Sequence, residues 1–259
     1  MTSFTYPGTY SGAILIIGNE ILSGRTQDTN THWMAARLTA KGIVLGEVRV
    51  VPHDHEVIVA AVDELRLRFH YVFTTGGIGP THDDITAEAV ADAFGVQLVM
   101  NEEACRAMEI HYGKDNMSDA RLKMAMIPEG AALIPNSVSA APGFIMENVY
   151  VMAGVPRIMQ AMMDYVLSHI PGGKPVLSNT VSCRLLESAI AEDLTKLQEK
   201  YEGIQIGSYP HYRGGEAGLS LVLRGTDPRT LEQATEGVLR LVRSHGDEPR
   251  AMSIRTVDS

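Results

Sequence analysis

Long apolar runs are missing from this sequence. The first apolar run extends only from Ala13 to Ile17, whereas a membrane-spanning helix needs about 20 apolar residues. The segment before it, Met1 to Gly12, contains no Lys or Arg, although a signal peptide has a basic start followed by a longer apolar core. We therefore expect a cytoplasmic protein that has no membrane partner.

Cysteine and an excess of basic residues are missing as well. The two cysteines, Cys105 and Cys183, lie far apart and outside any CxxC or Cys/His ligand spacing, so neither a zinc site nor a disulfide framework is expected. Lys and Arg number 22 against 31 Asp and Glu, which gives a net charge of -9. Because proteins that bind a nucleic-acid backbone carry a basic face, we expect no nucleic-acid partner.

What the sequence does have is the composition of a globular protein. Its 259 residues are 45% hydrophobic and 20% charged, and at about 150 residues per domain this length suggests one large domain or two unequal ones. The acidic excess is concentrated in residues 1–170, with 19 Asp and Glu against 11 Lys and Arg. Two interpretations are open: a solvated acidic surface, or carboxylates that hold a divalent cation for a phosphate-bearing ligand.

Strand and helix patterns alternate along the first hundred residues. Short apolar runs rich in β-branched residues predict buried strands, and helical patterns that end at glycines lie between them. The expected strands are residues 13–17, 43–51 and 71–75, and the expected helices are residues 28–41, 56–69 and 84–94. This alternation predicts an α/β fold with a mostly parallel sheet in three layers.

The second half of the chain has weaker patterns and a boundary. Residues 101–126 have a helical pattern that is interrupted near residues 113–118. Residues 143–152 predict a hairpin of two short strands around Glu147 and Asn148, and a helix is expected after Pro156. Two prolines and two glycines fall within residues 170–175, which predicts a domain boundary there. We expect a flexible tail at residues 1–12, an α/β domain at 13–170 and a smaller α+β domain at 176–250.

Three segments directly after predicted strands could form a site, because ligands of open α/β sheets bind outside the carboxyl ends of the strands. They are residues 18–30, residues 52–54 and residues 76–86. The third segment has three glycines in four positions and leads into a helix, an arrangement that favours a bound anion. Asp83 and Asp84 follow, either as helix caps or as ligands of a cation. The glycine spacing matches neither GxGxxG nor GxxxxGK[ST].

The sequence TTGGIGPTHDDIT (residues 74–86) resembles the signature of the molybdopterin-binding domain family. Together with IIGNEILSGRTQDTNTHWMAARL (residues 16–38), it is similar to the CinA proteins and to the molybdopterin-binding-like domain of FAD synthase. Further matching pieces follow in order, so the resemblance spans about residues 12–245. It implies a three-layer fold of molybdopterin-binding type and self-association into a homo-oligomer.

The resemblance also implies a set of site residues. Asp54 and Asp84 match acidic residues linked to metal and phosphoanhydride chemistry, so both are assigned as catalytic and metal-binding. Mg, Mn or Co is the implied cation, and molybdopterin or an adenine nucleotide is the implied ligand. The positions implied for nucleotide or pterin binding are Gly18, Glu20, Gly24, Asp28, Asn30, Gly76, Gly77, Gly79, Pro80, Thr81, Asp83, Thr86, Lys123, Pro142, Gly143, Gly154 and Pro156.

Three functions are consistent with this resemblance. The first is a metal-dependent pyrophosphatase, a hydrolase acting on a nucleotide anhydride of the ADP-ribose or FAD type. The second is a non-catalytic module that binds molybdopterin or a nucleotide, and the third is a molybdopterin adenylyltransferase. Asn19 stands where the family often has Asp, which removes one possible ligand charge. His53, His55 and His82 are interpreted as loop histidines without a role, with proton transfer as the alternative.

Overall fold

The structure, a computed structural model, describes residues 6–213 and 216–255. The chain divides into two units. The larger unit comprises Tyr10–Leu38 and Leu45–Pro171. The smaller unit takes the rest, in three separate segments: the residues before Tyr10, Thr39–Val44, and the chain from Gly172 onward. The smaller unit is therefore discontinuous in sequence.

A six-stranded sheet forms the centre of the larger unit, with the strand order β2-β1-β3-β8-β7-β6. The β1–β3 and β3–β8 pairs are parallel, and the pairs that β7 makes with β8 and β6 are antiparallel. Every residue of β3 is buried, and in β1 only Tyr10 is not, which explains why these strands read as continuous apolar runs. The strands are β1 (Tyr10–Ile17), β2 (Ile43–Val51), β3 (Tyr71–Thr75), β6 (Ala132–Ile134), β7 (Gly143–Met146) and β8 (Val149–Met152).

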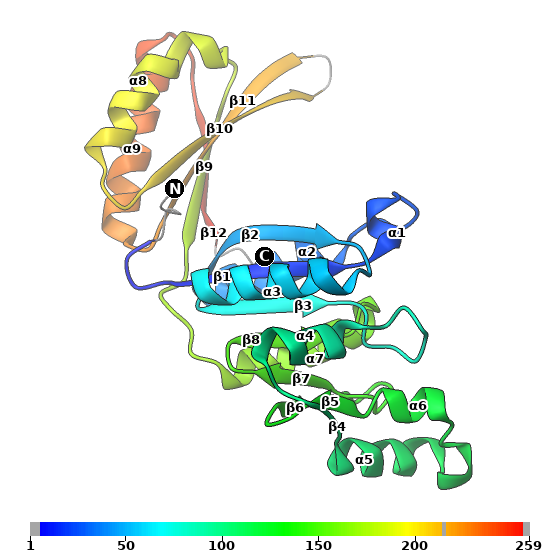
Figure 1. Cartoon of the computed structure of the whole chain (residues 1–259). Coiled ribbons are helices and arrows are strands. Elements are labelled where there is room, and N and C mark those ends of the chain that lie inside the picture. Colours follow the sequence, from blue (N-terminus) through cyan, green and yellow to red (C-terminus); the bar gives the residue numbers. More distant parts are fainter. Residues whose placement is uncertain (1–5, 214–215, 256–259) are drawn as a thin grey trace. The chain divides into compact units, whose positions relative to one another are not determined.

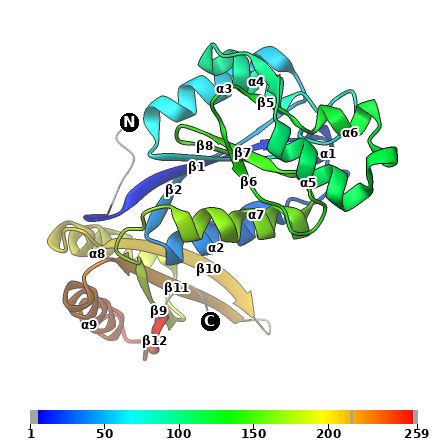
Figure 2. The ribbon, with the colours of Figure 1, turned by 90° about the horizontal axis from the view of Figure 1, so that it is seen from below.

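Helices cover both faces of this sheet, so the unit has three layers (Figure 2). Helices α3 (His55–Arg68) and α4 (Thr86–Phe94) lie on one face. Helices α2 (Asn30–Ala40) and α7 (Pro156–His169) lie on the other. The expected three-layer α/β fold with a mainly parallel sheet is confirmed.

The region between α4 and β6 follows its sequence prediction except at its end. Two helices form within residues 101–126, and they are separated by a 3-10 turn where the interruption near residues 113–118 is expected. Met126, however, belongs to a strand that pairs with residues 98–100. Gly113, at φ 84°, ends the longer helix. The elements are β4 (Leu98–Met100), α5 (Glu102–Tyr112), η1 (Lys114–Asn116), α6 (Asp119–Lys123) and β5 (Met126–Pro128).

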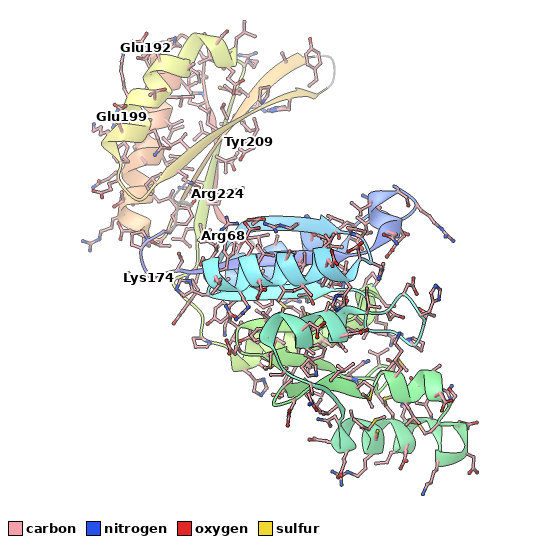
Figure 3. All side chains as sticks on the ribbon, in the orientation of Figure 1. Arg68, Lys174, Glu192, Glu199, Tyr209 and Arg224 are labelled. Atoms are coloured by element: carbon pink, nitrogen blue, oxygen red, sulfur yellow. The ribbon has the colours of Figure 1, made fainter. Side chains whose placement is uncertain are left out.

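The smaller unit has an antiparallel sheet with the order β10-β11-β9-β12 and two helices on one of its faces (Figure 1). Val181, Leu221 and Leu223 of the sheet pack with Leu231 and Val238 of α9. Figure 3 shows Glu192 and Glu199 of α8 pointing away from the sheet. The elements are β9 (Leu177–Cys183), α8 (Glu187–Lys200), β10 (Gln205–Arg213), β11 (Glu216–Gly225), α9 (Pro228–Ser244) and β12 (Arg250–Arg255).

The first strand begins before the expected end of the N-terminal tail. A flexible tail is expected through residue 12, but β1 begins at Tyr10, and the buried Tyr6 donates its hydroxyl hydrogen to Gln205 Oε1 at 2.7 Å. Residues 10–12 therefore belong to the sheet, and residues 1–5 lie outside the described part. Within the described residues, no helix combines the length and the apolar character needed to cross a bilayer.

The strand register brings several strand ends to one edge of the large sheet. Ile16 of β1 pairs with Thr75 of β3, and Thr75 pairs with Met152 of β8. The Gly18 N–H donates to Val51 O, at the end of β2, at 3.1 Å. The segments that follow these four strands therefore leave the sheet together, at the edge where α/β proteins bind ligands.

Candidate functional site

A glycine loop follows β3 at this edge. Gly76 and Gly77 adopt φ angles of 105° and 70°, which L side chains rarely adopt. A Cβ atom on Gly76 would lie 2.1 Å from Ile17 O, and one on Gly77 would lie 2.1 Å from Thr86 Oγ1. Both the backbone conformation and the close approach therefore require glycine at these positions.

Thr86, the first residue of α4, holds the loop in place. Its hydroxyl donates to Gly76 O at 3.0 Å and its N–H donates to Gly77 O at 2.9 Å. The side chain is fully buried. Thr86, which the resemblance places among the binding residues, thus acts as the internal support of the loop.

Thr81 connects the two acidic residues of the loop. Asp84 Oδ2 accepts the Thr81 N–H at 2.8 Å, and the Thr81 hydroxyl lies 2.5 Å from Asp84 Oδ2 and 2.7 Å from Asp83 Oδ1. The hydrogen bond from this hydroxyl holds the pKa of Asp83 below its ordinary value. The Lys123 ammonium of α6 donates an N–H hydrogen bond to Thr81 O, so a positive charge lies beside the loop.

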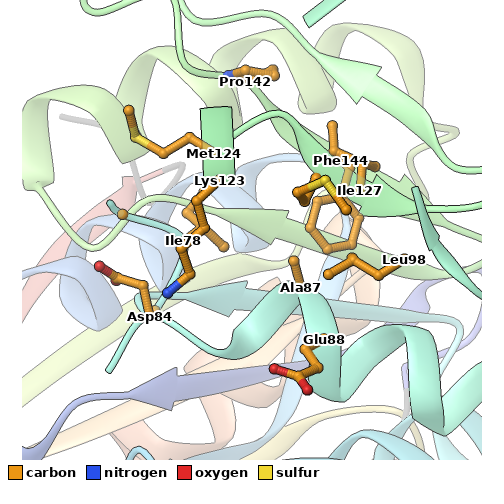
Figure 4. Close-up of a pocket in the computed structure, with 13 residues that line it drawn as sticks. Ile78, Asp84, Ala87, Glu88, Leu98, Lys123, Met124, Ile127, Pro142 and Phe144 are labelled. Atoms are coloured by element: carbon orange, nitrogen blue, oxygen red, sulfur yellow. The ribbon is translucent and has the colours of Figure 1, made fainter. Parts of the chain in front are cut away.

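A pocket opens beside the glycine loop, and we call it the loop pocket (Figure 4). Asp84 and Lys123 lie on one side of it, and Phe144 and Ile127 form part of its apolar wall. Its lining residues are Gly77, Ile78, Gly79, Asp84, Ala87, Glu88, Leu98, Lys123, Met124, Met126, Ile127, Pro142 and Phe144.

A second pocket shares the same loop through Gly76. We call it the acidic pocket, because Glu20 and Asp28 line it and, among the described residues, no Lys, Arg or His does. The lining residues are Ile16, Ile17, Glu20, Ile21, Thr26, Gln27, Asp28, Thr29, Asn30, Thr75, Gly76, Gly154 and Pro156.

Asn30 fixes the start of α2 against the sheet edge inside this second pocket. It is only 8% exposed, and its Nδ2 donates to Thr75 Oγ1 at 3.1 Å and to Gly154 O at 2.9 Å. The Thr75 hydroxyl donates in turn to Ala153 O at 2.8 Å. Asp28 Oδ1 accepts the Thr31 N–H at 3.0 Å. These bonds tie the ends of β3 and β8 to the start of α2.

Residues 13–177 match the family model described as "Probable molybdopterin binding domain". The chain belongs to this molybdopterin-binding domain family. A second model, described as the middle domain of FAD synthase, matches residues 175–246. The molybdopterin-binding domain thus contains both pockets, and the resemblance that the glycine-loop motif suggests is confirmed.

Relatives of similar length exist in archaea. A protein of Aeropyrum pernix is 34% identical over 261 residues, which cover 95% of this chain and 97% of the relative. A protein of Metallosphaera sedula is 31% identical over 251 residues, with 91% and 94% covered. Among solved structures, the CinA protein of unknown function from Thermoplasma acidophilum is 33% identical, with a TM-score of 0.59 over 62% of this chain and 97% of that protein.

The molybdopterin-binding domain brings eleven of the implied residues to its two pockets. The loop pocket takes Gly77, Gly79, Asp84, Lys123 and Pro142, and the acidic pocket takes Glu20, Asp28, Asn30, Gly76, Gly154 and Pro156. The other implied residues line neither pocket: Gly18, Gly24, Asp54, Pro80, Thr81, Asp83, Thr86 and Gly143. Packing explains the glycine at position 143, because a Cβ atom there would lie 2.3 Å from Val151 O.

Asp54 and Asp84 have different surroundings in the domain. Asp54 is exposed, and its Oδ1 caps α3 by accepting the Val57 N–H at 3.1 Å. In residues 6–213 and 216–255, no three His, Cys, Asp or Glu side chains form a group that could hold a metal. Mg²⁺, however, binds through one or two carboxylates together with substrate phosphates and water. Asp84 fits such an ion only as a ligand that it shares with a bound phosphate.

Sequence reasoning misses most of the apolar wall of the loop pocket. Part of this wall comes from Ile127 of β5 and Phe144 of β7, which carry no local signal for ligand binding. His53, of the expected site segment 52–54, lies at the loop, with its Cε1 atom 3.4 Å from where a Cβ on Gly77 would be. The backbone N–H of His53 donates to Asn19 Oδ1 at 3.3 Å. Asn19 therefore supports the segment after β2, a bond that an aspartate oxygen could equally accept.

Proposed function

We propose that the larger unit binds a phosphate-bearing pterin or nucleotide at its glycine loop. One observation carries this proposal: the loop pocket combines an ammonium group and loop backbone with an apolar wall. Lys123 supplies the positive charge, and Phe144, Met124 and Ile127 supply apolar surface. A phosphate favours such charge beside a helix N-terminus, and a flat heterocycle favours the apolar wall.

Binding of ADP to the purified full chain, measured by isothermal titration, tests the proposal. Lys123→Gln removes the charge at the loop, and because a hydrogen bond to a charged group contributes about 1.5–3 kcal/mol, we expect affinity to fall about tenfold or more. Lys114→Gln is the matched control, because Lys114 is exposed on η1 and lines neither pocket. No ADP binding by the unchanged chain, or equal affinities in both variants, would contradict the proposal.

A second candidate function is metal-dependent hydrolysis of a phosphoanhydride of the ADP-ribose or FAD type. Asp84 favours it, because this carboxylate lines the loop pocket and its Oδ1 receives no hydrogen bond from the described residues. A bound divalent cation supplies a Lewis acid and a water of lowered pKa. The Thr81 N–H orients the Asp84 carboxylate through a hydrogen bond, and Lys123 stabilises negative charge on the phosphates. Asp54 enters this candidate only as the cap of α3.

Release of AMP from ADP-ribose and from FAD, with Mg²⁺, Mn²⁺ or Co²⁺, tests this second candidate. Asp84→Ala should lower turnover on the order of 100-fold, since it removes the carboxylate that would hold the divalent cation against the phosphates. Asp115→Ala, on the exposed η1 turn outside both pockets, should leave turnover unchanged. Retained ADP binding without turnover on any substrate would overturn the hydrolase and leave a binding module.

A further inference from the structure

We propose that the smaller unit has an anion site of its own, in which Arg184, His211 and Arg250 bind the phosphate group of a ligand. These residues line a pocket that is built only from the smaller unit, and we call it the arginine pocket. None of the site residues that the resemblance implies lies in it, so this site goes beyond the proposed function. The polar residues that line it are Ser182, Arg184, His211, Asp247, Glu248 and Arg250.

Strand alternation places this pocket at the sheet face opposite α8 and α9 (Figure 1). Val181 of β9 and Leu219 of β11 are buried in the core that the sheet forms with these helices. Side chains alternate between the two faces of a strand, so the neighbouring Ser182 and Gly218 belong to the opposite face. Arg250 of β12 is the register partner of Ser182, and directly opposite residues share a face. Arg250 and Ser182 therefore lie side by side at the pocket.

His211 of β10 reaches the same pocket by lying over a glycine. Its register partner is Gly218, and a Cβ atom on Gly218 would lie 2.6 Å from His211 Nε2 and 3.1 Å from its Cε1. Glycine at this position therefore leaves the space that the imidazole ring fills. Nδ1 lies 3.3 Å from Ser220 Oγ, whereas no described residue bonds to Nε2. Nε2 is thus the ring nitrogen that remains for a ligand.

The two carboxylates of the pocket leave Arg250 free to bind an anion. Asp247 accepts the backbone N–H groups of Arg184 at 2.5 Å and of Glu248 at 3.0 Å, and its Oδ1 lies 3.4 Å from Arg184 Nη2. Because the Asp247 side chain is 9% exposed and that of Arg184 is 75% exposed, Asp247 holds a guanidinium group whose remaining N–H groups are open to solvent. The Glu248 side chain is 88% exposed and lies 4.0 Å from Arg243. Within the described part of the chain, no carboxylate pairs with Arg250.

A phosphate group matches this set of donors. Guanidinium groups bind phosphate oxygens through paired N–H donors, and here the donors come from the segments of β9, β10 and β12. Tyr209, two residues before His211, lies on the same face of β10 and is 50% exposed. Its ring lies over Gly207, where a Cβ atom would be 2.9 Å from Tyr209 Cε2. Because such a ring offers a stacking surface for a heterocycle, the site favours a nucleoside monophosphate over a free phosphate ion.

NMR of the full chain, following the His211 imidazole signal during titration with inorganic phosphate at constant pH, tests the proposal. His211→Gln identifies the signal by its loss. We expect the signal to shift until it saturates, and we expect Arg250→Gln to need about tenfold more phosphate for the same shift. Arg243→Gln is the matched control and should titrate like the unchanged chain, because Arg243 is exposed on α9 and does not line the pocket. An equal shift with sodium chloride at the same ionic strength would overturn the proposal, as would equal titrations of Arg250→Gln and the unchanged chain.

Two further comparisons separate the phosphate sources and the two sites. AMP should saturate the His211 shift at about tenfold lower concentration than ribose 5-phosphate, since stacking on Tyr209 adds affinity, and Tyr209→Ala should remove that difference. Equal titrations with the two esters would overturn the nucleotide as the source. Lys123→Gln should leave the His211 titration unchanged, because Lys123 lines the loop pocket. Loss of ADP binding with the His211 shift retained would contradict only the proposed function.

Discussion

At the scale of single residues, the glycine loop depends on backbone conformations that no other residue adopts without strain. Gly77→Ala would combine a φ of 70° with a Cβ atom 2.1 Å from the buried Thr86 hydroxyl. We expect this variant to lose at least about 2 kcal/mol of unfolding free energy and most of its nucleotide affinity.

Gly95→Ala separates the cost of the positive φ angle from the cost of the close Cβ contact. Gly95 has a similar φ of 65°, but nothing lies within 4 Å of its Cβ position. This control should lose only about 1 kcal/mol, the cost of the left-handed conformation alone, and should keep its affinity. Urea denaturation and ADP titration of both variants measure the difference. Equal losses in the two variants would contradict the role assigned to the close contact.

The lowered pKa of Asp83 makes the unfolding free energy of the protein depend on pH in the acidic range. Because the Thr81 hydrogen bond favours the charged carboxylate, it stabilises the folded protein above the ordinary pKa of about 3.9. That contribution is lost as the pH falls through the lowered pKa of the folded state. Thr81→Val should therefore make the decline of the unfolding free energy below about pH 4 shallower, as measured by urea denaturation from pH 2 to 6. An unchanged pH profile would contradict this assignment.

At the scale of elements, Asp54 has two possible roles: it caps the start of α3, or it takes part in catalysis. Its carboxylate accepts the Val57 N–H at the start of α3, so Asp54→Ala should cost about 1 kcal/mol of unfolding free energy. Asp54→Asn keeps the cap, because Asn caps helices as well as Asp does, but it removes the charge that a metal would need. If Asp54 only caps α3, Asp54→Asn changes neither stability nor AMP release. A large loss of AMP release in a stable Asp54→Asn variant would restore Asp54 to the metal site.

The sequence predicts the elements that have strong local patterns. β2 and β3 form at the predicted bounds, and the hairpin of β7 and β8 turns at Glu147 and Asn148, as expected. Three-residue strands such as β4 and β6 lack enough residues for a periodic pattern. The glycine-loop residues are predictable because strained turns require glycine. The apolar wall of the loop pocket is not, since residues such as Phe144 and Leu98 meet only through tertiary packing.

At the scale of the whole molecule, the smaller unit depends on residues from distant parts of the chain. The Gly173 N–H donates to Lys41 O at 3.0 Å, and the Lys174 N–H donates to Gly8 O at 2.9 Å. A Cβ atom on Gly42 would lie 2.4 Å from the backbone carbon of Gly173. The domain boundary at residues 170–175 is thus a junction with earlier segments as well as a linker. The homo-oligomer implied by the resemblance stays a prediction.

Gly42→Ala tests this dependence. Its Cβ would meet backbone atoms, which cannot move aside as a flexible side chain can, and its φ is 72°. We expect a loss of at least about 2 kcal/mol of unfolding free energy with ADP affinity unchanged. Gly203→Ala, at a φ of 80° with open space around its Cβ position, is the control and should lose about 1 kcal/mol. Thermal and urea unfolding of both variants decide the outcome.

The three-segment origin of the smaller unit restricts how this protein can be rearranged by recombination. A unit built from one continuous stretch can be moved between genes by two cuts. Here the unit takes residues from before Tyr10, from Thr39–Val44 and from Gly172 onward. A gene fragment that encodes only the chain from Gly172 onward would therefore lack the two earlier segments. Moving the smaller unit intact therefore requires all three of its segments.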